Sequence, residues 1–205
     1  MSKATQTDAM GSIQRGIKRT LDFVMSALGL ILLSPLFIII SVLMKFQGNG
    51  PIFFRQIRIG YKGKPFVILK FRTISKKTEK NTPQLIAKTS CKSSTPFEKF
   101  LREHHLDELP QLWNVLVGDM SLVGPRPERK YFIDKIMEHT DLYTVIYNMR
   151  PGLTSEATLY NGYTDTMEKM LKRLQMDISY FERRSLWLDF KIIIKTFVNI
   201  ISGNK

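Results

Sequence analysis

Cysteine, histidine and, in one part of the chain, acidic residues are scarce in these 205 residues. The single cysteine, Cys91, excludes an internal disulfide framework, and three histidines without CxxC or HxxxH spacing argue against a Cys/His zinc site. Residues 45–102, the basic block, contain only Glu79 and Glu98 as acids against fourteen Lys or Arg, so they hold +12 of the net charge of +13. Such an excess predicts an anionic partner, which is nucleic acid, anionic lipid or a phosphorylated substrate.

Charged residues are also absent from residues 23–44, an apolar run bounded by Asp22 and Lys45. As a straight helix these 22 residues extend about 33 Å, enough to cross a bilayer core of about 30 Å. A buried core helix and a secretory signal are the alternatives. Because the run is apolar on every face and no small-residue cleavage site precedes the basic block, we interpret it as a membrane segment.

Ser34 and Pro35 lie in the middle of the apolar run. Proline removes a backbone hydrogen bond and bends a helix, and each half, about 17 Å long, reaches only part of the way across a bilayer. Both flanks are basic, which favours a re-entrant helix with both ends on the cytoplasmic side over a kinked spanning helix. The Ser34 hydroxyl is expected to satisfy a backbone carbonyl freed at the break.

Composition and periodicity predict a single mainly helical α+β chain with a mobile tail at 1–12, a re-entrant membrane helix at 13–46 and a cytoplasmic-face domain at 47–205. The last helical pattern is amphipathic and either lies in the lipid interface, with Trp187 as an anchor, or packs onto the core. Within the domain we expect a β-hairpin of strands 52–59 and 65–71, a solvated loop at 75–94, and helices over 97–102, 106–117, 129–148 and 186–201.

Asp107 and Glu108 are adjacent carboxylates just ahead of a helical pattern, with Pro110 in its expected first turn. One interpretation is that Asp107 only caps the helix. The other is catalytic: a helix N-terminus keeps a carboxylate ionised and helps to hold a phosphate, so that one carboxylate attacks while the other binds Mg²⁺. The spacing alone leaves both interpretations open.

The stretches around these carboxylates resemble a known family. LDELPQLWNVL at 106–116 and GDMSLVGPRP at 118–127 closely resemble the bacterial sugar transferases, small monotopic phosphoglycosyl transferases that prime glycan assembly on a polyprenyl phosphate. The resemblance is specific because matching motifs occur in order over roughly residues 15–201. The other motifs are Lys18-Arg19 through Asp22, Ser34-Pro35, GPIFFRQ at 50–56, KPF at 64–66, KFRT at 70–73 and RPGLT at 150–154.

The resemblance implies a two-step transfer of a phospho-sugar from a UDP-sugar to undecaprenyl phosphate, with release of UMP. Asp107 matches the nucleophile that forms a covalent phospho-sugar aspartate, and Glu108 matches its partner in the dyad, with Mg²⁺ beside them. Arg126, between Pro125 and Pro127, matches a motif associated with holding the nucleotide. Further basic residues at family positions are expected to hold phosphates: Lys70, Arg72, Arg102 and Arg150.

The resemblance also implies a monotopic protein of the bacterial inner membrane, with a helical catalytic core, amphipathic interfacial helices and an active site at the cytoplasmic face. Anionic phospholipids are then expected partners of the basic block, and nucleic acid is not. His104 and His105, where the family often has small hydroxyl residues, and the run 155–163 depart from the family pattern, which leaves the donor sugar open. A homodimer is one alternative for the oligomeric state. The competing functions are a non-catalytic, membrane-anchored lipid- or partner-binding protein and a silent scaffold for later glycan enzymes.

Overall fold

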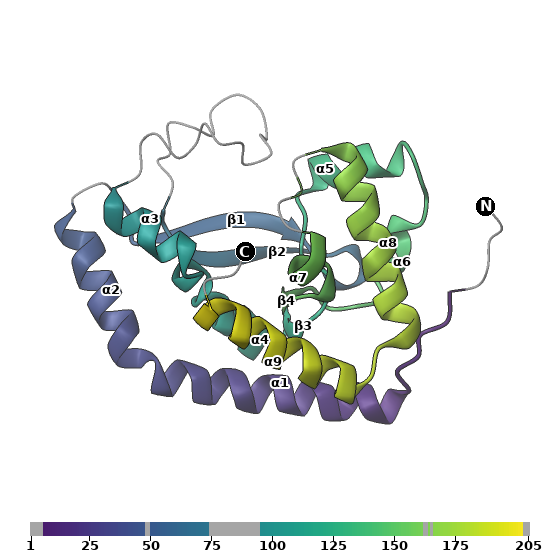
Figure 1. The fold of residues 1–205 in the computed structure, drawn as a ribbon, viewed down its shortest axis with the longest axis horizontal. Coiled ribbons are helices and arrows are strands. Elements are labelled where there is room, and N and C mark those ends of the chain that lie inside the picture. Colours follow the sequence, from purple (N-terminus) through teal and green to yellow (C-terminus); the bar gives the residue numbers. More distant parts are fainter. Residues whose placement is uncertain (1–5, 48–49, 74–94, 162–163, 165, 203–205) are drawn as a thin grey trace.

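The computed structural model describes residues 6–47, 50–73, 95–161, 164 and 166–202, and it is mainly helical, as predicted (Figure 1). The expected loop at 75–94, with Cys91, lies outside the described residues. The helices are α1 (Ser12–Leu32), α2 (Ser34–Phe46), α3 (Pro96–Glu103), α4 (Gln111–Val117), α5 (Lys130–Met137), α6 (Tyr143–Ile146), α7 (Glu156–Asn161), α8 (Met167–Arg183) and α9 (Leu186–Ser202). The strands are β1 (Phe53–Ile59), β2 (Pro65–Phe71), β3 (Ser121–Val123) and β4 (Gly152–Thr154), and the 3₁₀ turns are η1 (Tyr61–Gly63) and η4 (Leu106–Glu108).

The predicted helix break is observed, because α1 and α2 meet at an angle of 58° on either side of Leu33 (Figure 1). Pro35, in the first turn of α2, has no N–H to donate to the carbonyl of Ile31, four residues earlier. The Ser34 hydroxyl donates to that carbonyl instead, at 2.8 Å. Among the described helices none is by itself both long and apolar enough to cross a membrane, whereas this bent pair meets the requirement jointly.

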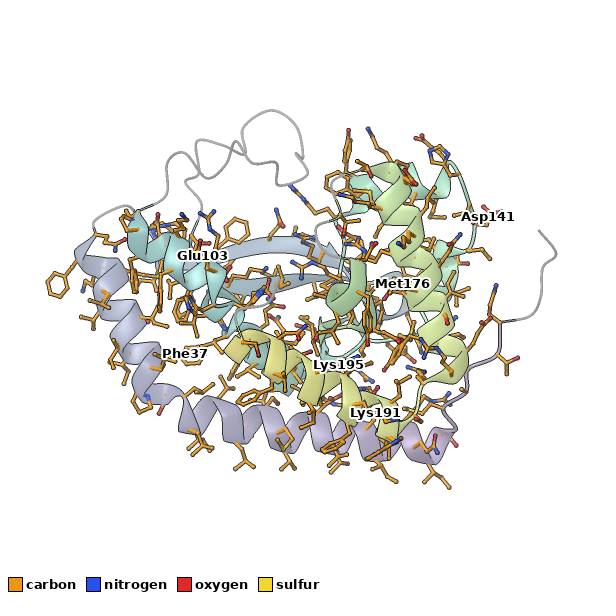
Figure 2. All side chains as sticks on the ribbon, in the orientation of Figure 1. Phe37, Glu103, Asp141, Met176, Lys191 and Lys195 are labelled. Carbon is orange, nitrogen blue, oxygen red and sulfur yellow. The ribbon has the colours of Figure 1, made fainter. Side chains whose placement is uncertain are left out.

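Apolar side chains cover the outward sides of α1, α2 and α9. In Figure 2 the side chains along the outer edge of α1 point away from the rest of the protein. Helix α9 is amphipathic as predicted and packs onto the core through Asp189 and Ile192, which are buried, while Trp187 and Phe197 are more than half exposed. The alternative placement in a lipid interface stays a prediction. The exposed apolar residues are Ile13, Ile17, Leu21, Phe23, Val24, Met25, Leu28, Ile31 and Leu32 on α1, Ile38, Ile39, Val42, Leu43 and Phe46 on α2, and Trp187, Phe190, Ile193, Ile194, Phe197, Val198 and Ile200 on α9.

The end of the expected N-terminal tail is anchored to the core. Met10 is fully buried, and the Asp8 carboxylate accepts hydrogen bonds from Arg184 at 2.6 and 2.7 Å and from Arg15 at 2.6 Å. Burial raises the pKa of Asp8, but its hydrogen bonds, the one from Arg184 foremost, lower the pKa below the ordinary value overall. Asp8 and Met10 are therefore fixed against the rest of the protein before α1 begins, which a polar, aperiodic stretch did not predict.

Three polar residues of α1 hold it against the rest of the fold. Lys18 forms an ion pair of 2.6 Å with Asp189 at the start of α9. Asp22, which is buried, accepts a 2.7 Å bond from the hydroxyl of Ser121 in β3. The Arg19 guanidinium donates to two carbonyls in the last turn of α4, at 2.7 and 2.8 Å, where a helix end leaves carbonyls without partners. The Lys-Arg-Asp motif thus attaches the bent helix pair to the rest of the protein.

The predicted hairpin is confirmed: β1 and β2 pair antiparallel, with Phe53 opposite Phe71 and Ile59 opposite Pro65.

Two predicted helices are interrupted. The pattern at 106–117 begins as the 3₁₀ turn η4, and α4 starts only after Pro110, which lacks the N–H needed to continue one helix through both. The pattern at 129–148 divides into α5 and α6, because the Thr140 hydroxyl accepts from the backbone two residues on and competes with the helix.

Candidate active site

The two adjacent carboxylates lie in η4, a tight turn preceded by His105 in the left-handed region at φ 55°. Asp107 is only 8% exposed. The first residue of α4 is Gln111, so the dyad lies just ahead of that helix, as expected, and the interpretation of Asp107 as its cap is wrong. His104 is exposed, and its ring packs at a tilt against the ring of Phe100, with the ring centroids 4.2 Å apart.

Glu108 is surrounded by positive charge from distant parts of the chain. The Lys70 ammonium, from β2, lies 2.5 Å from its carboxylate, and the Arg126 guanidinium lies 3.4 Å from the same oxygen. Burial raises the pKa of Glu108, but the charges of Lys70 and Arg126 outweigh this effect and hold the pKa well below its ordinary value. Glu108 is therefore ionised at every physiological pH.

Asp107 has the opposite electrostatic state. Burial is the main cause and raises the pKa of its carboxyl to about 6, although Lys70 and Arg126 partly oppose the rise. Two adjacent carboxylates whose pKa values are moved in opposite directions are typical of a site where each has its own chemical role. A desolvated carboxylate close to its titration point is also a stronger nucleophile than a fully hydrated one.

Asn114 fixes the distance between the strand that carries Lys70 and the turn that carries the dyad. Its amide oxygen accepts from the backbone N–H of Leu69 at 3.0 Å, and its amide nitrogen donates to the carbonyl of Val67 at 2.8 Å. The side chain thus pairs with the free edge of β2 as another strand would. Because Asn114 follows Glu108 by six residues, this pairing sets how Lys70 meets Glu108.

Replacing Asn114, which is 2% exposed, by alanine is expected to lower the free energy of unfolding by about 2–3 kcal/mol, because two part-buried hydrogen bonds to the backbone of β2 are lost. The measurement is the melting temperature of the purified variant in detergent. Val117→Ala is the matched control, since Val117 belongs to the same helix and is 52% exposed. Equal melting temperatures for the two variants would contradict the bridging role of Asn114.

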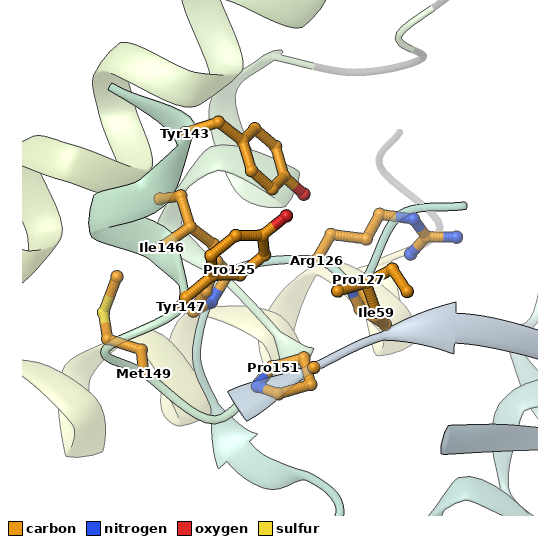
Figure 3. Close-up of a pocket in the computed structure, with 10 residues that line it drawn as sticks. Ile59, Pro125, Arg126, Pro127, Tyr143, Ile146, Tyr147, Met149 and Pro151 are labelled. Carbon is orange, nitrogen blue, oxygen red and sulfur yellow. The ribbon is translucent and has the colours of Figure 1, made fainter. Parts of the chain in front are cut away.

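The Pro125-Arg126-Pro127 segment is held rigidly on both sides of its arginine. The Pro125 carbonyl accepts from Gly152 at 2.9 Å and the Pro127 carbonyl accepts from Arg58 at 3.0 Å. Both prolines line a cavity of about 10 Å³, room for about one water molecule and far too small for a nucleotide. Figure 3 shows the Arg126 side chain extending away from the cluster of Tyr143, Ile146 and Met149 in that lining. The prolines therefore position Arg126, which reaches Glu108.

Glu128, directly after this segment, is the centre of a buried ionic network. Its carboxylate binds Arg173 of α8 through one oxygen and Arg58 of β1, at 3.4 Å, through the other. Its backbone carbonyl also accepts from Ile59 at 3.0 Å. Burial raises the pKa of Glu128, but the charges of Arg173 and Arg58 outweigh it and lower the pKa below its ordinary value. The network fastens the Arg126 segment to both the hairpin and α8.

Three other predicted phosphate-binding residues take different positions. Arg150 donates to the carbonyl of Gly118 at 3.0 Å and lies over the ring of Tyr61, so it supports the end of α4, and none of the contacts found for it among the described residues reaches the dyad. Arg102 is in the last turn of α3, a helix that packs against η4. Arg72 is almost fully buried just beyond β2. Of the basic residues predicted for the site, Lys70 and Arg126 contact the dyad, both through Glu108.

The dyad suits Mg²⁺ better than a metal that needs an all-protein cage. In the described part of the chain there is no cluster of three or more His, Cys, Asp or Glu able to bind a metal ion. Mg²⁺ typically binds one or two carboxylates and takes its other ligands from substrate phosphates and water. Glu108, kept ionised, and Asp107 beside it can supply these carboxylates.

Sequence reasoning did not single out Asn114 or Glu128 as site residues. For Glu128 a signal was available, since an acid directly after Pro-Arg-Pro in a basic chain must find cationic partners if it is buried. For Asn114 there was none beyond its place in the motif, because its partners are backbone groups of a strand more than forty residues earlier.

Comparison with known proteins identifies the family. The family model described as bacterial sugar transferase matches residues 13–203. The chain is 40% identical over 190 residues to the UDP-glucose:undecaprenyl-phosphate glucose-1-phosphate transferase of Klebsiella pneumoniae, covering 91% of this chain and 40% of that protein. It is 36% identical over 187 residues to the UDP-N-acetylgalactosamine-undecaprenyl-phosphate N-acetylgalactosaminephosphotransferase of Aeromonas hydrophila, covering 91% of this chain and 44% of that protein.

A third relative is shorter. The UDP-glucose:undecaprenyl-phosphate glucose-1-phosphate transferase of Caulobacter vibrioides is 40% identical over 188 residues, covering 90% of this chain and 70% of that protein. The chain thus spans about two fifths of the length of the Klebsiella and Aeromonas relatives, and it matches each of the three over nearly its own whole length. The dyad and its two cations, Lys70 and the proline-flanked Arg126, all lie inside the matched region. This chain belongs to the bacterial sugar transferase family.

Proposed function

We propose that this protein transfers a sugar 1-phosphate from a UDP-sugar to undecaprenyl phosphate, giving undecaprenyl-diphospho-sugar and UMP, and so initiates the assembly of a bacterial glycan. The observation that carries the proposal is the pair of carboxylates with opposite pKa shifts, set between Lys70 and Arg126. The names of the relatives support it, since they describe this reaction with glucose or N-acetylgalactosamine as the sugar.

In the first step the Asp107 carboxylate attacks the phosphorus that bears the sugar. A bond forms between the carboxylate oxygen and this phosphorus, and the bond to the oxygen that bridges the two phosphates breaks. UMP leaves with that electron pair, and a phospho-sugar aspartate remains. Burial of Asp107 favours the attack, because the ionised carboxylate is poorly solvated and gains by forming the bond.

In the second step an oxygen of the undecaprenyl phosphate attacks the same phosphorus. The new diphosphate bond forms as the acyl phosphate bond to Asp107 breaks, which restores the carboxylate and releases undecaprenyl-diphospho-sugar. No proton or oxidant is needed, because each step exchanges one anionic oxygen for another at phosphorus.

Both steps bring an anion to a phosphate, so positive charge at the site lowers the barrier. Lys70 and Arg126 supply fixed charge, and Arg126 suits a phosphate because its planar fork can bind two oxygens. Glu108, with Asp107, would hold Mg²⁺, which neutralises phosphate oxygens when it is bound. Lys70 neutralises Glu108 in the structure described, so a bound Mg²⁺ would have to share this carboxylate with the lysine.

The apolar surface of α1, α2 and α9 supports a location at the bacterial plasma membrane, with the bent pair α1–α2 re-entering on the cytoplasmic side. So many exposed apolar side chains on adjoining elements are characteristic of a surface that contacts lipid. The basic block adds attraction to anionic headgroups of about 1 kcal/mol for each well-placed charge. Such a site meets a lipid phosphate in the membrane and a soluble UDP-sugar at its surface.

The test is release of UMP by detergent-solubilised protein supplied with undecaprenyl phosphate, Mg²⁺ and, in turn, UDP-glucose, UDP-galactose and their N-acetylated counterparts. We expect UMP and a labelled lipid product with at least one donor, and trapping of one equivalent of radiolabelled sugar phosphate on the protein when the acceptor is omitted. Absence of UMP with every donor would reject the enzyme and favour a binding protein or scaffold. UMP release without a trapped adduct would reject the covalent route alone.

A further inference from the structure

Arg72 is a buried cation that forms no ion pair with any of the described residues. The residue is only 3% exposed, and its Nη1 atom is buried with no hydrogen-bond partner in the described structure. Two other deeply buried arginines differ in this respect: Arg173 binds the Glu128 carboxylate and Arg184 binds that of Asp8. Because buried guanidinium groups are normally paired with an anion and the described residues place none at Nη1, the Arg72 site has room for an anionic ligand.

The strand geometry places Arg72 beside the reacting centre. Its backbone N–H donates to the carbonyl of Ile52 at 2.9 Å, so the pairing of β2 with β1 continues one residue beyond Phe71. Side chains alternate along a strand, which puts Lys70 and Arg72 on one face about 7 Å apart. Lys70 contacts Glu108. An anion bound by Arg72 would therefore lie next to the phosphate that Lys70 and the dyad hold.

The guanidinium is enclosed by the connection that follows the membrane helices. Gly50, which follows α2 by four residues, has φ 113°, a conformation suited to glycine. A Cβ at this position would lie 2.9 Å from Nη1 of Arg72. The backbone at Gly50 thus closes over the guanidinium, and the absence of a side chain there leaves room at the nitrogen that lacks a partner.

The neighbourhood of Arg72 selects among the anions of the reaction. Gly50, which lies against the Arg72 guanidinium, follows α2 by four residues, and the inner side of that helix is buried through Ile40 and Met44. The other side of α2 exposes apolar side chains, among them Ile39 and Val42. A ligand that brings a phosphate to this end of β2 therefore lies beside an apolar path into lipid, which suits a polyprenyl phosphate and does not suit a nucleotide.

We propose that Arg72, under the backbone of Gly50, binds the phosphate of the lipid acceptor, separately from the cations Lys70 and Arg126 on the donor. The inference rests on the proposed function, and it divides the basic residues of the site between two substrates. The lipid phosphate and the phospho-sugar on Asp107 are both anions and repel each other. Arg72 on the lipid phosphate and Lys70 between the two phosphates would offset this repulsion and bring the attacking oxygen to the phosphorus.

The test separates the two half-reactions in Arg72→Met and Arg72→Lys, with Arg183→Met as control because Arg183 is a half-exposed arginine outside the basic block. We expect Arg72→Met to form one equivalent of UMP without acceptor, with an unchanged KM for the UDP-sugar. Its KM for undecaprenyl phosphate should rise at least about tenfold, as expected for loss of a buried charged contact, and Arg72→Lys should show a smaller rise. Arg183→Met should match the wild type in both KM values.

An unchanged KM for the lipid in Arg72→Met, or a raised KM for the UDP-sugar instead, would overturn the assignment. Assays in neutral detergent and in anionic nanodiscs distinguish the source of the phosphate: an effect present only in anionic bilayers would mean that Arg72 binds bulk headgroups, and would also overturn it. If Arg72→Met does not fold, Arg72→Lys decides by the same two KM values. Failure of the proposed function gives a different result, since the wild type itself would then form no UMP.

Discussion

Replacement of Asp107 by asparagine is expected to reduce UMP release by at least about 10³-fold and to stabilise the protein at the same time. Asparagine has nearly the same shape but no anionic oxygen to attack phosphorus, so neither half-reaction can start. Burial raises the pKa of Asp107 to about 6 in the folded protein, against 3.8 as the reference value. At pH 8 the ionised carboxylate therefore has a higher free energy in the folded protein than in the unfolded chain. Its neutral replacement should raise the melting temperature by a few degrees.

Glu108→Gln is the matched variant, and its stability should change in the opposite direction. The folded pKa of Glu108 lies below its ordinary value, so its ionised form stabilises the fold at any pH above the ordinary pKa, and this contribution is lost as the pH falls through the folded pKa. At pH 8 the glutamine variant should melt below the wild type, because Lys70 loses its partner. Melting curves and UMP release of both variants, with exposed Asp141→Asn as a control, test the scheme. Full activity in Asp107→Asn would refute the assignment of Asp107 as the nucleophile.

The pH profile of the donor half-reaction gives an independent check. The nucleophile must be ionised, so kcat/KM for the UDP-sugar is expected to fall as the pH drops through about 6, the pKa of Asp107 in the free enzyme. Lys70 lowers that pKa. In Lys70→Met the acidic limb should therefore move to higher pH, whatever activity remains. A profile that is flat between pH 5 and 8 in the wild type would contradict the assignment of Asp107 as the titrating group.

The parts of the fold that depend on neighbouring residues could be predicted from the sequence. The hairpin follows from two alternating runs around a short turn, and the bend in the N-terminal helix follows from the missing N–H of Pro35. Ser34 could be assigned to the freed carbonyl because both groups lie within one turn. The dyad could be located because its motif is long and continuous, and residues 106–127 carry most of the resemblance.

The electrostatics of the site could not be predicted, because they depend on residues far apart in the chain. Lys70 precedes Glu108 by 38 residues, and periodicity gives no information on which strand residue reaches which turn. The opposite pKa shifts of the dyad follow from burial and from two cations that only the tertiary fold brings close. The position of Arg150 was missed for the same reason, since its partner is a carbonyl 32 residues earlier and not the dyad.

The second large effect is expected for Glu128→Gln, which should lower the free energy of unfolding by about 3–5 kcal/mol. The substitution removes the charge that Arg173 and Arg58 share, and Arg173 is only 7% exposed, so its guanidinium would remain buried without a counter-charge. Glu156→Gln is the matched control, because its partner Arg183 is half exposed and surface ion pairs contribute about 0–1 kcal/mol. Chemical unfolding in detergent at pH 7 measures both.

The same substitution should also reach the active site through the backbone. Glu128 holds the segment that carries Arg126, so kcat/KM for the UDP-sugar is expected to fall by about tenfold in Glu128→Gln. In the control Glu156→Gln, kcat/KM should stay unchanged. The folded pKa of Glu128 is lowered, so its contribution to wild-type stability is present above the ordinary pKa of glutamate and disappears as the pH falls through the folded value. The stability gap between wild type and Glu128→Gln should therefore narrow in acid. A gap that stays constant down to pH 3 would mean that the carboxylate charge is not what holds Arg126 in place.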